Sequence, residues 1–264
     1  MYEKNRRVGR EAAAGAAAEE TEGQLEGRNA LQEALKSGRT IDKVFIAAGE
    51  IDRGLQRLAA EAKEAGAVVV PVDRRKLDAM SFTHAHQGVI AQAAAHVYYS
   101  IDDILEEAAS RGETPLIVIC DELSDPHNLG AILRSAECAG AHGVIIPKRR
   151  SVGLTATVAK ASAGAVEYMK VARVTNISAA IGELKEKGVW VFGTAAEGSI
   201  PMYQADLSGP TAIVIGNEGA GLSQLVRKNC DVMVNIPMRG RISSLNASAA
   251  ASILLYEALR QRLG

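Results

Sequence analysis

Residues 114–264 alternate short apolar runs with stretches of helical spacing, and few folds accommodate that order. Runs rich in Val and Ile predict strands at Leu116–Cys120, His142–Ile146, Glu167–Val171, Val189–Thr194, Thr211–Ile215 and Asp231–Ile236. Helical spacing predicts helices near Leu129–Ala139, Gly153–Ala161, Ile177–Glu186, Leu222–Lys228 and Asn246–Arg262. Strands joined by crossover helices form a parallel sheet that is covered on both faces. The sequence therefore predicts an α/β domain whose ligands bind beyond the carboxyl ends of the strands.

The preceding residues divide into three parts by composition. Residues 1–23 consist mainly of Ala, Glu, Gly and Arg, which predicts a flexible tail. Residues 24–95 alternate helix and strand on a smaller scale, with a β-branched run at Ala67–Val72, which predicts a small α/β domain. Residues 96–113 contain a charged helical stretch and are predicted to link this domain to the one at 114–264.

Charge and cysteine content narrow the functional classes. Residues 1–113 carry 15 basic and 19 acidic side chains (−4), and residues 114–264 carry 15 and 12 (+3), so RNA contact would need local basic patches. The longest apolar runs, such as Pro115–Cys120, are too short to cross a bilayer.

The three cysteines are widely spaced and odd in number, which disfavours a disulfide framework or a zinc site. Because disulfide-stabilised proteins are typical of oxidising compartments, this pattern predicts a cytoplasmic protein.

The loop after the strand Leu116–Cys120 has the first unusual composition. It runs Asp125-Pro-His-Asn-Leu-Gly130 and leads into a helix that carries Arg134. Asn128 is a good helix N-cap residue, so capping by Asn128 and a solvated charge at Arg134 explain the pattern without a function.

The loop after Thr211–Ile215 is rich in glycine. It reads Gly216-Asn-Glu-Gly-Ala-Gly221, and glycines allow backbone to approach a ligand closely or to adopt positive φ. Its spacing is not that of a dinucleotide-binding loop, and no acidic residue ends a strand about 20 residues later. A tight strand-to-helix turn is the alternative, although a packing role does not account for Glu218.

The loop after the last predicted strand reads Ile236-Pro-Met-Arg-Gly-Arg-Ile-Ser-Ser-Leu-Asn246. Ser244 or Asn246 is placed to cap the final helix, whose first residues, Ala247–Ser252, are small and permit close packing. A capped terminal helix beside incidental arginines is the alternative interpretation.

Together these loops resemble the motifs of the SpoU (TrmH-type) RNA ribose 2′-O-methyltransferases of the SPOUT superfamily. The matching segments are Asp125–Arg134, Ile215–Gly221, and Ile236–Met238 with Ser243–Ser248. In the first half, Glu26–Leu31, Val44–Ala47 and His86–Val89 resemble the substrate-binding domain of the family, which has an L30e-like fold. Within the family, the likeness is greatest to enzymes that methylate a guanosine ribose of 23S rRNA.

The resemblance implies more about the fold than periodicity does. It implies that residues 114–264 form a parallel-sheet domain with a deep trefoil knot, in which the chain from Ile236 to the start of the last helix is threaded through a loop. Such knots are rare in proteins. The resemblance also implies a homodimer with its active site at the interface, an RNA substrate, and no requirement for a metal or a membrane.

The resemblance further implies that S-adenosylmethionine binds among the three loops. The residues expected to bind this cofactor are Thr194, Ala195, Gly216, Asn217, Gly219, Ile236, Met238 and Leu245. The residues expected to act at the ribose are Arg134, Asn128, Glu218, Ser244 and Asn246. The residues expected to contact RNA in the first domain are Arg28, Asn29, His86 and Gln87. Arg134 is expected to deprotonate the 2′-hydroxyl with help from an RNA phosphate, or only to position phosphate and ribose.

Three other functions remain open from the sequence. A tRNA-directed enzyme of the same family would carry the same motifs. A non-catalytic RNA-binding protein on this fold would be expected to have a damaged glycine loop or to lack Arg134, and neither change is present. A nucleotide-dependent oxidoreductase would need the dinucleotide fingerprint and a histidine placed for hydride transfer; His127 is the only histidine in these loops, and a bystander role suits it better.

Overall fold

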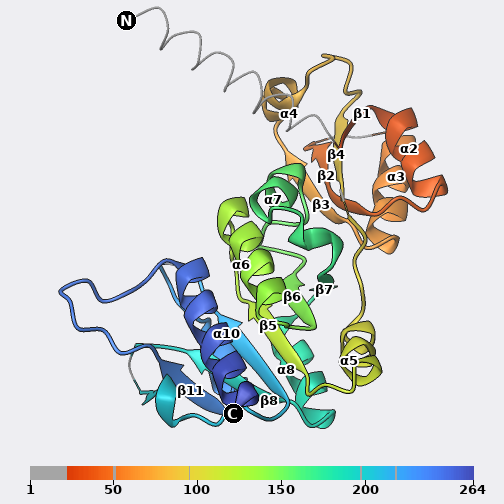
Figure 1. The fold of residues 1–264 in the computed structure, drawn as a ribbon. Coiled ribbons are helices and arrows are strands. Elements are labelled where there is room, and N and C mark those ends of the chain that lie inside the picture. Colours follow the sequence, from red (N-terminus) through yellow and green to blue (C-terminus); the bar gives the residue numbers. More distant parts are fainter. Residues whose placement is uncertain (1–22, 50–51, 95, 197, 218) are drawn as a thin grey trace, which may run out of the picture. The chain divides into compact units, whose positions relative to one another are not determined.

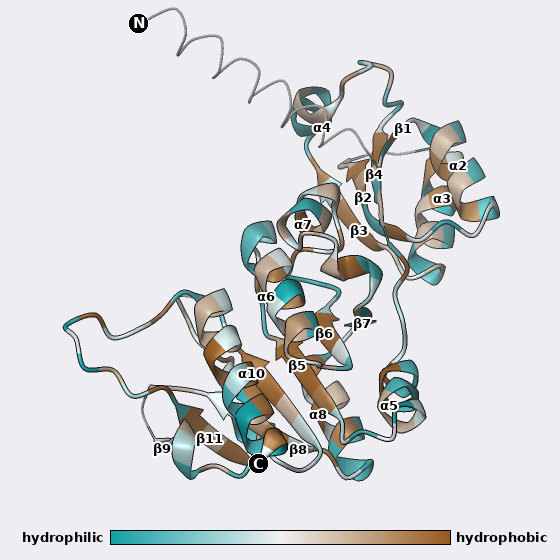
Figure 2. Cartoon of the chain, viewed as in Figure 1, coloured by the Kyte–Doolittle hydropathy of each residue, from teal (hydrophilic) through white to brown (hydrophobic). Residues whose placement is uncertain are grey.

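The computed structural model describes residues 23–49, 52–94, 96–196, 198–217 and 219–264. The chain divides into two compact units, one that ends at Val97 and also includes Leu154–Thr157, and one made of Tyr98–Gly153 and Val158–Gly264. Each unit has its own sheet and core, so each is described separately. Apolar residues concentrate in the strands of both units, while the outer sides of the helices are hydrophilic (Figure 2).

The first unit is a four-stranded sheet with three helices in its described residues. In chain order the elements are β1 (Gln24–Glu26), α2 (Arg28–Lys36), β2 (Ile41–Ala47), α3 (Arg53–Glu64), β3 (Val68–Val72), α4 (Arg74–Met80) and β4 (Val89–Ala93). The sheet order is β1-β4-β2-β3, with β2 and β3 parallel and β4 antiparallel to both of its neighbours. β1 has only one large apolar residue, Leu25, which explains why the sequence pattern does not predict it.

The core of the first unit fills the space between the sheet and helices α2 and α3. Leu31 of α2, Leu55 and Leu58 of α3, and Val44 and Ile46 of β2 belong to one buried cluster. The Asp52 carboxylate caps α3 by accepting a hydrogen bond from Leu55 N at 3.0 Å. Amphipathic helices packed on one face of the sheet therefore hold this unit together.

The second unit is built around a seven-stranded sheet in which all paired strands are parallel (Figure 1). Its strands are β5 (Leu116–Cys120), β6 (Gly143–Pro147), β7 (Lys170–Val174), β8 (Trp190–Thr194), β9 (Ile200–Pro201), β10 (Thr211–Ile215) and β11 (Val232–Asn235). Its helices are α5 (Ile101–Ser110), α6 (Pro126–Cys138), α7 (Ala156–Ala161), α8 (Ile177–Glu186), α9 (Gln224–Asn229) and α10 (Ala247–Leu263), with short 3-10 turns at Ala165–Glu167 and Met202–Gln204. The strand order β7-β6-β5-β10-β8-β11-β9 confirms the predicted parallel α/β class.

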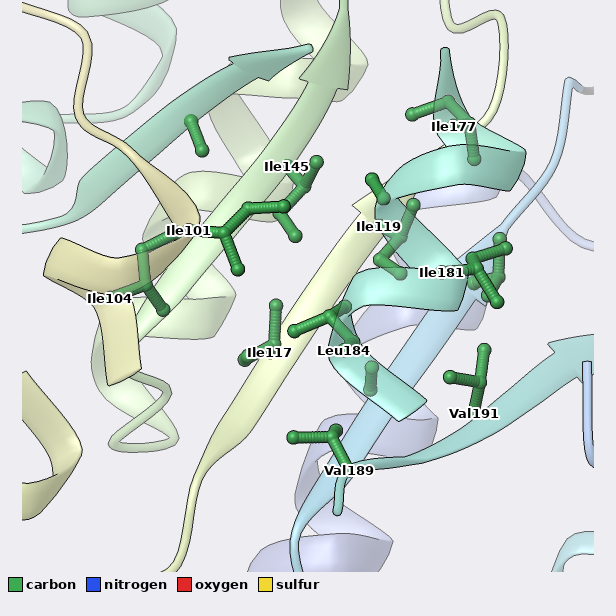
Figure 3. Close-up of a cluster of buried hydrophobic side chains, with 14 of the residues drawn as sticks. Ile101, Ile104, Ile117, Ile119, Ile145, Ile177, Ile181, Leu184, Val189 and Val191 are labelled. Carbon is green, nitrogen blue, oxygen red and sulfur yellow. The ribbon is translucent and has the colours of Figure 1, made fainter. Parts of the chain in front are cut away.

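A cluster of Ile, Leu and Val side chains forms one face of this core. Ile177, Ile181 and Leu184 of α8 lie over the sheet beside Ile119 of β5 and Val191 of β8 (Figure 3). Each of these side chains is nearly excluded from solvent. Burial of a large aliphatic side chain contributes roughly 1.5–3 kcal/mol, so this face is a major source of stability.

Most of the segment predicted as a linker, from Tyr98 onward, belongs to the second unit. Helix α5 carries Ile101 and Ile104 into the same cluster, close to Ile145 of β6 (Figure 3). Ser100 caps α5 and forms a capping box with Asp103. The acidic residues of α5 led the sequence analysis to predict a linker, although Ile101 and Ile104 on its other side are apolar and buried.

Among the other boundaries that differ from the sequence prediction, two have an evident physical cause. Helix α6 begins at Pro126 rather than Leu129, because proline suits the first helical turn and Asp125 Oδ1 caps it by accepting from His127 N at 2.8 Å. Asn128 therefore lies inside the helix, and its interpretation as an N-cap is wrong. Strand β7 begins at Lys170 rather than Glu167, because residues Ala165–Glu167 form a 3-10 turn after Gly164 at φ 89°.

The last helix is anchored at its carboxyl end by Arg262. Its guanidinium donates to the backbone carbonyls of Thr114, Pro115, Leu207 and Gly209, at 2.6 to 3.3 Å. Burial lowers the pKa of this guanidinium from its ordinary value. In the described part of the chain, no helix is both long and apolar enough to cross a membrane.

Candidate functional site

The loops that follow three of the adjacent parallel strands surround one cavity. Strands β5, β10, β8 and β11 are neighbours in the sheet, so their carboxyl ends lie along one edge. A cavity of about 880 Å³ opens at this edge, lined by residues after β8, β10 and β11 and by the start of α10. Cavities between about 300 and 1,000 Å³ are typical small-molecule sites.

All of the residues predicted to bind a cofactor line this cavity. They are Thr194, Ala195, Gly216, Asn217, Gly219, Ile236, Met238 and Leu245. Ser244, predicted to act at the ribose, also lines it. Residues that are distant in sequence are therefore brought together at the edge that the rule for parallel sheets indicates.

The glycine-rich loop is fixed by hydrogen bonds within itself. Asn217 N donates to Gly221 O at 3.1 Å and Gly221 N donates to Asn217 O at 2.9 Å. The Asn217 side chain accepts from Gly219 N at 2.9 Å and donates to Glu122 O at 3.1 Å. Asn217 thus shapes the loop and ties it to the loop after β5.

Gly216 is required by the loop itself. A Cβ at this position would lie 2.4 Å from Gly221 C and 2.6 Å from both Gly221 O and Leu222 N. These atoms are backbone and cannot move independently of the loop. The sequence analysis attributed this glycine to the close approach of a ligand. The structure shows a second reason, because any side chain at this position would collide with the backbone of the same loop.

Two asparagines connect α6 to the start of α10. Asn246 caps α10, as predicted, with its Oδ1 accepting from Ser248 N at 2.9 Å and Ala249 N at 3.3 Å. Its Nδ2 donates to Oδ1 of the buried Asn128 at 2.8 Å. Farther along the two helices, the Ser135 and Ser252 hydroxyls lie 2.7 Å apart. Asn128 and Asn246 are therefore joined, but they hold two helices in register and do not line the cavity.

Arg134 lies on the exposed side of α6 and does not line the cavity. The neighbouring residue Ser135 faces α10. Successive residues of a helix are rotated by about 100° about its axis, so Arg134 points away from that contact. Within the described residues, its guanidinium has no hydrogen-bond or ion-pair partner. Arg134 is thus available to a ligand or to another chain. Glu218 lies outside the described residues.

Sequence reasoning did not identify the two acidic residues after β5. The buried Asp121 carboxylate accepts a hydrogen bond from Ser223 N at 2.9 Å, which joins this loop to the start of α9. Glu122 has φ 60° and pairs with Arg150 at 2.7 Å. The sequence signal that could have identified them is the position of two consecutive acidic residues directly after a buried strand.

In the first unit, Arg28 and Gln87 lie together. Arg28 N donates to Gln87 Oε1 at 3.2 Å, and Arg28 Nε donates to Gln87 O at 3.3 Å. The Arg28 guanidinium also holds both carboxylate oxygens of Asp52, at 3.0 and 2.6 Å, and lowers the pKa of Asp52. Asn29 is exposed on the next position of α2.

His86, predicted to contact RNA, is buried in the structure. Its side chain is 4% exposed, and both ring nitrogens have partners. Nε2 lies 2.9 Å from Asp78 Oδ1, and Nδ1 accepts from Gly88 N at 3.0 Å. In this structure the His86 ring fixes the turn that presents Gln87, and its direct contact with RNA stays a prediction.

Glu26 holds the loop between α4 and β4 and was not predicted as a site residue. Its carboxylate accepts hydrogen bonds from Ser81 Oγ at 2.7 Å, Phe82 N at 2.7 Å, Thr83 N at 3.1 Å and the Thr83 hydroxyl. Although burial opposes the charge, the hydrogen bonds prevail and lower the pKa of Glu26 to about 2. The loop that ends at Gln87 is therefore held in one conformation.

The stability of the protein should depend on the charge of Glu26. Because its folded pKa lies below its ordinary value of 4.5, the carboxylate stabilises the fold above about pH 4.5, and this contribution disappears as the pH falls toward 2. We expect Glu26→Gln to lower the free energy of unfolding by about 2 kcal/mol at pH 7, after allowance for solvent screening. Urea denaturation at pH 7 and pH 2.5 measures this difference, which should fall to about a quarter of its pH 7 value at the lower pH, because that pH lies just above the folded pKa of about 2. An equal difference at both pH values would show that the charge of Glu26 is not responsible.

No group of three or more His, Cys, Asp or Glu side chains in the described ranges is arranged to hold a metal ion. The free cysteines Cys120, Cys138 and Cys230 are buried, exposed and half-buried, respectively. Burial raises the pKa of the Cys120 thiol to about 12.

Two family models match the chain. The model described as the SpoU rRNA Methylase family matches residues 115–256. A second, described as RNA 2'-O ribose methyltransferase substrate binding, matches residues 24–99. The two matches correspond to the units with the larger and the smaller sheet.

Curated relatives match over most of their length. A putative TrmH family tRNA/rRNA methyltransferase, YacO of Bacillus subtilis, is 48% identical over 236 residues, covering 89% of this chain and 94% of the relative. The 23S rRNA (guanosine-2'-O-)-methyltransferase RlmB of Ralstonia nicotianae is 44% identical over 225 residues, covering 85% and 89%.

Solved structures share the architecture. The SpoU methyltransferase AviRb from Streptomyces viridochromogenes, in complex with the cofactor AdoMet, matches with a TM-score of 0.58 and 26% identity, covering 91% of this chain and 90% of the other. An AdoMet-bound rRNA methyltransferase from Sinorhizobium meliloti matches with a TM-score of 0.56 and 27% identity, covering 91% and 88%.

Proposed function

Because the chain belongs to the SpoU rRNA methylase family, we propose that it transfers a methyl group from S-adenosylmethionine to a ribose 2′-hydroxyl of RNA. The observation that carries this proposal is the single cavity at the carboxyl edge of the sheet, which gathers every residue expected to bind the cofactor. The substrate-binding model over residues 24–99 supports RNA as the acceptor.

The cavity residues suit S-adenosylmethionine. The loop at Gly216 and the chain at Ile236 and Leu245 offer backbone groups to an adenine edge, while Met238 and Leu245 add apolar surface. Asn217 keeps the glycine loop in shape by its hydrogen bonds to Gly219 N and Glu122 O. When bound, this cofactor supplies an electrophilic methyl group on a sulfonium.

We assign the chemistry at the ribose to Arg134. The 2′ oxygen must lose its proton as its bond to the methyl carbon forms and the bond from carbon to sulfur breaks. An arginine remains protonated, so Arg134 orients the RNA phosphate and ribose and stabilises the developing oxyanion, while the phosphate participates in removing the proton. Asn128 and Asn246 position α6, and Ser244 adds a hydroxyl to the cavity wall. We keep Glu218, which lies outside the described residues, as a candidate for orienting the ribose.

A homodimer would explain the position of Arg134. It is exposed on α6 and absent from the cavity lining, so a second copy of the chain would have to complete the reacting centre. Exposed apolar side chains that line the cavity, including Ile242 at 72% and Met238 at 39%, would then be covered. We further propose that residues 236–246 are threaded through a loop to form a trefoil knot.

We propose 23S rRNA as the substrate and the cytoplasm as the compartment. The similarity to RlmB of Ralstonia nicotianae favours rRNA, and the L30e-like domain at 24–95 would read its structure, joined by 96–113 to the methyltransferase domain at 114–264. A tRNA enzyme is the second candidate, favoured by the tRNA/rRNA description of YacO.

Labelling tests the proposal directly. The protein is incubated with 23S rRNA, or with tRNA, and tritiated S-adenosylmethionine, and the labelled nucleotide is mapped. We expect label on one guanosine ribose of 23S rRNA and none on tRNA. Label on tRNA alone would select the second candidate, whereas label on a base would contradict transfer to the ribose.

A further inference from the structure

A second cavity, of about 530 Å³, lies in the first unit. Its polar wall contains Arg28, Asp52, Arg74 and Gln87, which come from four different parts of the unit. Its apolar lining comes from Ala47 and Leu55. All of these residues belong to one compact unit, so the cavity does not depend on the second unit.

The cavity carries one positive charge that the protein does not neutralise. The Arg28 guanidinium is already engaged by both oxygens of Asp52 and by Gln87 O. Arg74 is exposed and, within the described residues, has no hydrogen-bond or ion-pair partner. The part of the cavity wall formed by Arg74 is therefore suited to bind an anionic group, such as a phosphate.

The rest of the cavity suits a flat heterocycle. Leu55 is 2% exposed and Ala47 is the last residue of β2, so both provide rigid apolar surface. Gly88 adds no side chain; a Cβ there would lie 3.3 Å from Leu55 Cδ2 and 3.8 Å from Ala47 Cβ, within this space. The Gln87 side chain accepts from Arg28 N through Oε1, which leaves its NH₂ group to donate to a base edge.

We propose that this cavity holds one unpaired nucleotide of the RNA substrate, remote in the chain from the methyl-transfer loops. Arg74 binds its phosphate, and its base lies against Ala47 and Leu55 with an edge toward Gln87. Sequence-specific RNA recognition commonly takes unpaired bases out of the stack in this way. The proposal rests on RNA being the substrate of the proposed function, and it assigns the first unit a specific nucleotide subsite.

Two neighbouring arginines provide a matched test. Arg74 and Arg75 are both exposed on the first turn of α4, but only Arg74 lines the cavity. Fluorescence anisotropy is measured with a fluorescein-labelled transcript of the 23S rRNA fragment that the wild-type protein methylates. We expect Arg74→Ala to weaken binding about 10-fold and Arg75→Ala less than about 2-fold, because only Arg74 lines the cavity in which its guanidinium can bind the phosphate. Equal losses in the two variants would overturn the proposal, since they would indicate diffuse attraction.

A filling variant tests whether RNA enters the cavity. Ala47→Phe occupies the apolar space and keeps both arginines, so we expect it to weaken binding about 10-fold while the melting temperature stays near that of the wild type. Wild-type affinity in Ala47→Phe would overturn the proposal, because Arg74 would then be an ordinary surface contact. If this variant does not fold, the comparison of Arg74 with Arg75 decides the question.

The failure of this proposal is distinguishable from failure of the proposed function. A wild-type protein that methylates no RNA contradicts the proposed function. A wild-type protein that methylates RNA, together with equal binding by Arg74→Ala and Arg75→Ala, contradicts only the nucleotide subsite.

Discussion

Replacing Arg134 by alanine should abolish methyl transfer and leave cofactor affinity unchanged. Arg134 does not line the cavity in which the cofactor is proposed to bind, so its loss should not change the dissociation constant for S-adenosylmethionine. Its exposed guanidinium is the cation assigned to the RNA phosphate and ribose. We expect the rate at saturating RNA and cofactor to fall by about 1,000-fold, the upper end of the loss that follows removal of one preorganised donor at a developing oxyanion.

Arg134→Lys separates charge from geometry. Lysine keeps the positive charge but loses the planar fork that binds phosphate and ribose together. We expect this variant to lose at least about 100-fold in rate, as general acid–base and positioning effects do. Substantial activity in Arg134→Lys would instead identify Arg134 as an electrostatic anchor.

Glu137→Ala is the matched control for Arg134→Ala. Glu137 is exposed on the same helix, one turn later, and we expect its removal to leave the rate within about 2-fold of wild type. Calorimetric titration with S-adenosylmethionine and single-turnover transfer of tritium measure the two quantities. Near wild-type transfer by Arg134→Ala would contradict the role assigned to this residue.

Adding one methyl group at Gly216 should eliminate cofactor binding. In Gly216→Ala the new Cβ would lie 2.4 Å from Gly221 C and 2.6 Å from Gly221 O, far inside normal contact. The loop must open, which breaks the paired hydrogen bonds between Asn217 and Gly221 and displaces the wall of the cavity. We expect the affinity for S-adenosylmethionine to fall by at least about 100-fold, since each hydrogen bond left unmade at a buried polar group costs about 1–3 kcal/mol.

Gly182→Ala provides the control for this change. Gly182 lies within α8, where a Cβ meets no other atom within 4 Å. We expect unchanged cofactor affinity and slightly higher stability, because alanine favours a helix over glycine by about 1 kcal/mol. Calorimetry on both variants, with circular dichroism to confirm folding, measures the effect. Wild-type affinity in a folded Gly216→Ala protein would place the cofactor outside the glycine-rich loop.

The positions of the main elements could be predicted because their signals are local. The runs at Leu116–Cys120 and Thr211–Ile215 form strands with the predicted bounds, since both are short segments rich in Ile and Val that are buried on both faces. The glycine spacing at 216–221 likewise indicated a loop at a ligand-binding edge, because backbone freedom is a property of the residue itself.

The failures of prediction also have physical causes. The helix start at Pro126 was obscured because proline breaks strands but begins helices, and only the tertiary setting selects between these effects. The burial of His86 was not predicted from its motif, because it depends on Asp78 and on the turn before β4. Glu26 carries no signal of its own, since its hydrogen-bond partners lie more than 50 residues later in the chain.

By itself, the sequence determined the alternation of strands and helices, the parallel α/β class, and the three loops that hold the unusual residues. These features follow from side-chain hydrophobicity, branching and glycine spacing, which act within a few residues. The tertiary structure decided which of those residues meet. It brings Thr194, Gly216 and Leu245 to one cavity, joins Asn128 to Asn246, leaves Arg134 outside the cavity, and places Arg74 beside Gln87 in a second one. Such contacts depend on strand order and on the path of each crossover, and these are set by the packing of the whole unit.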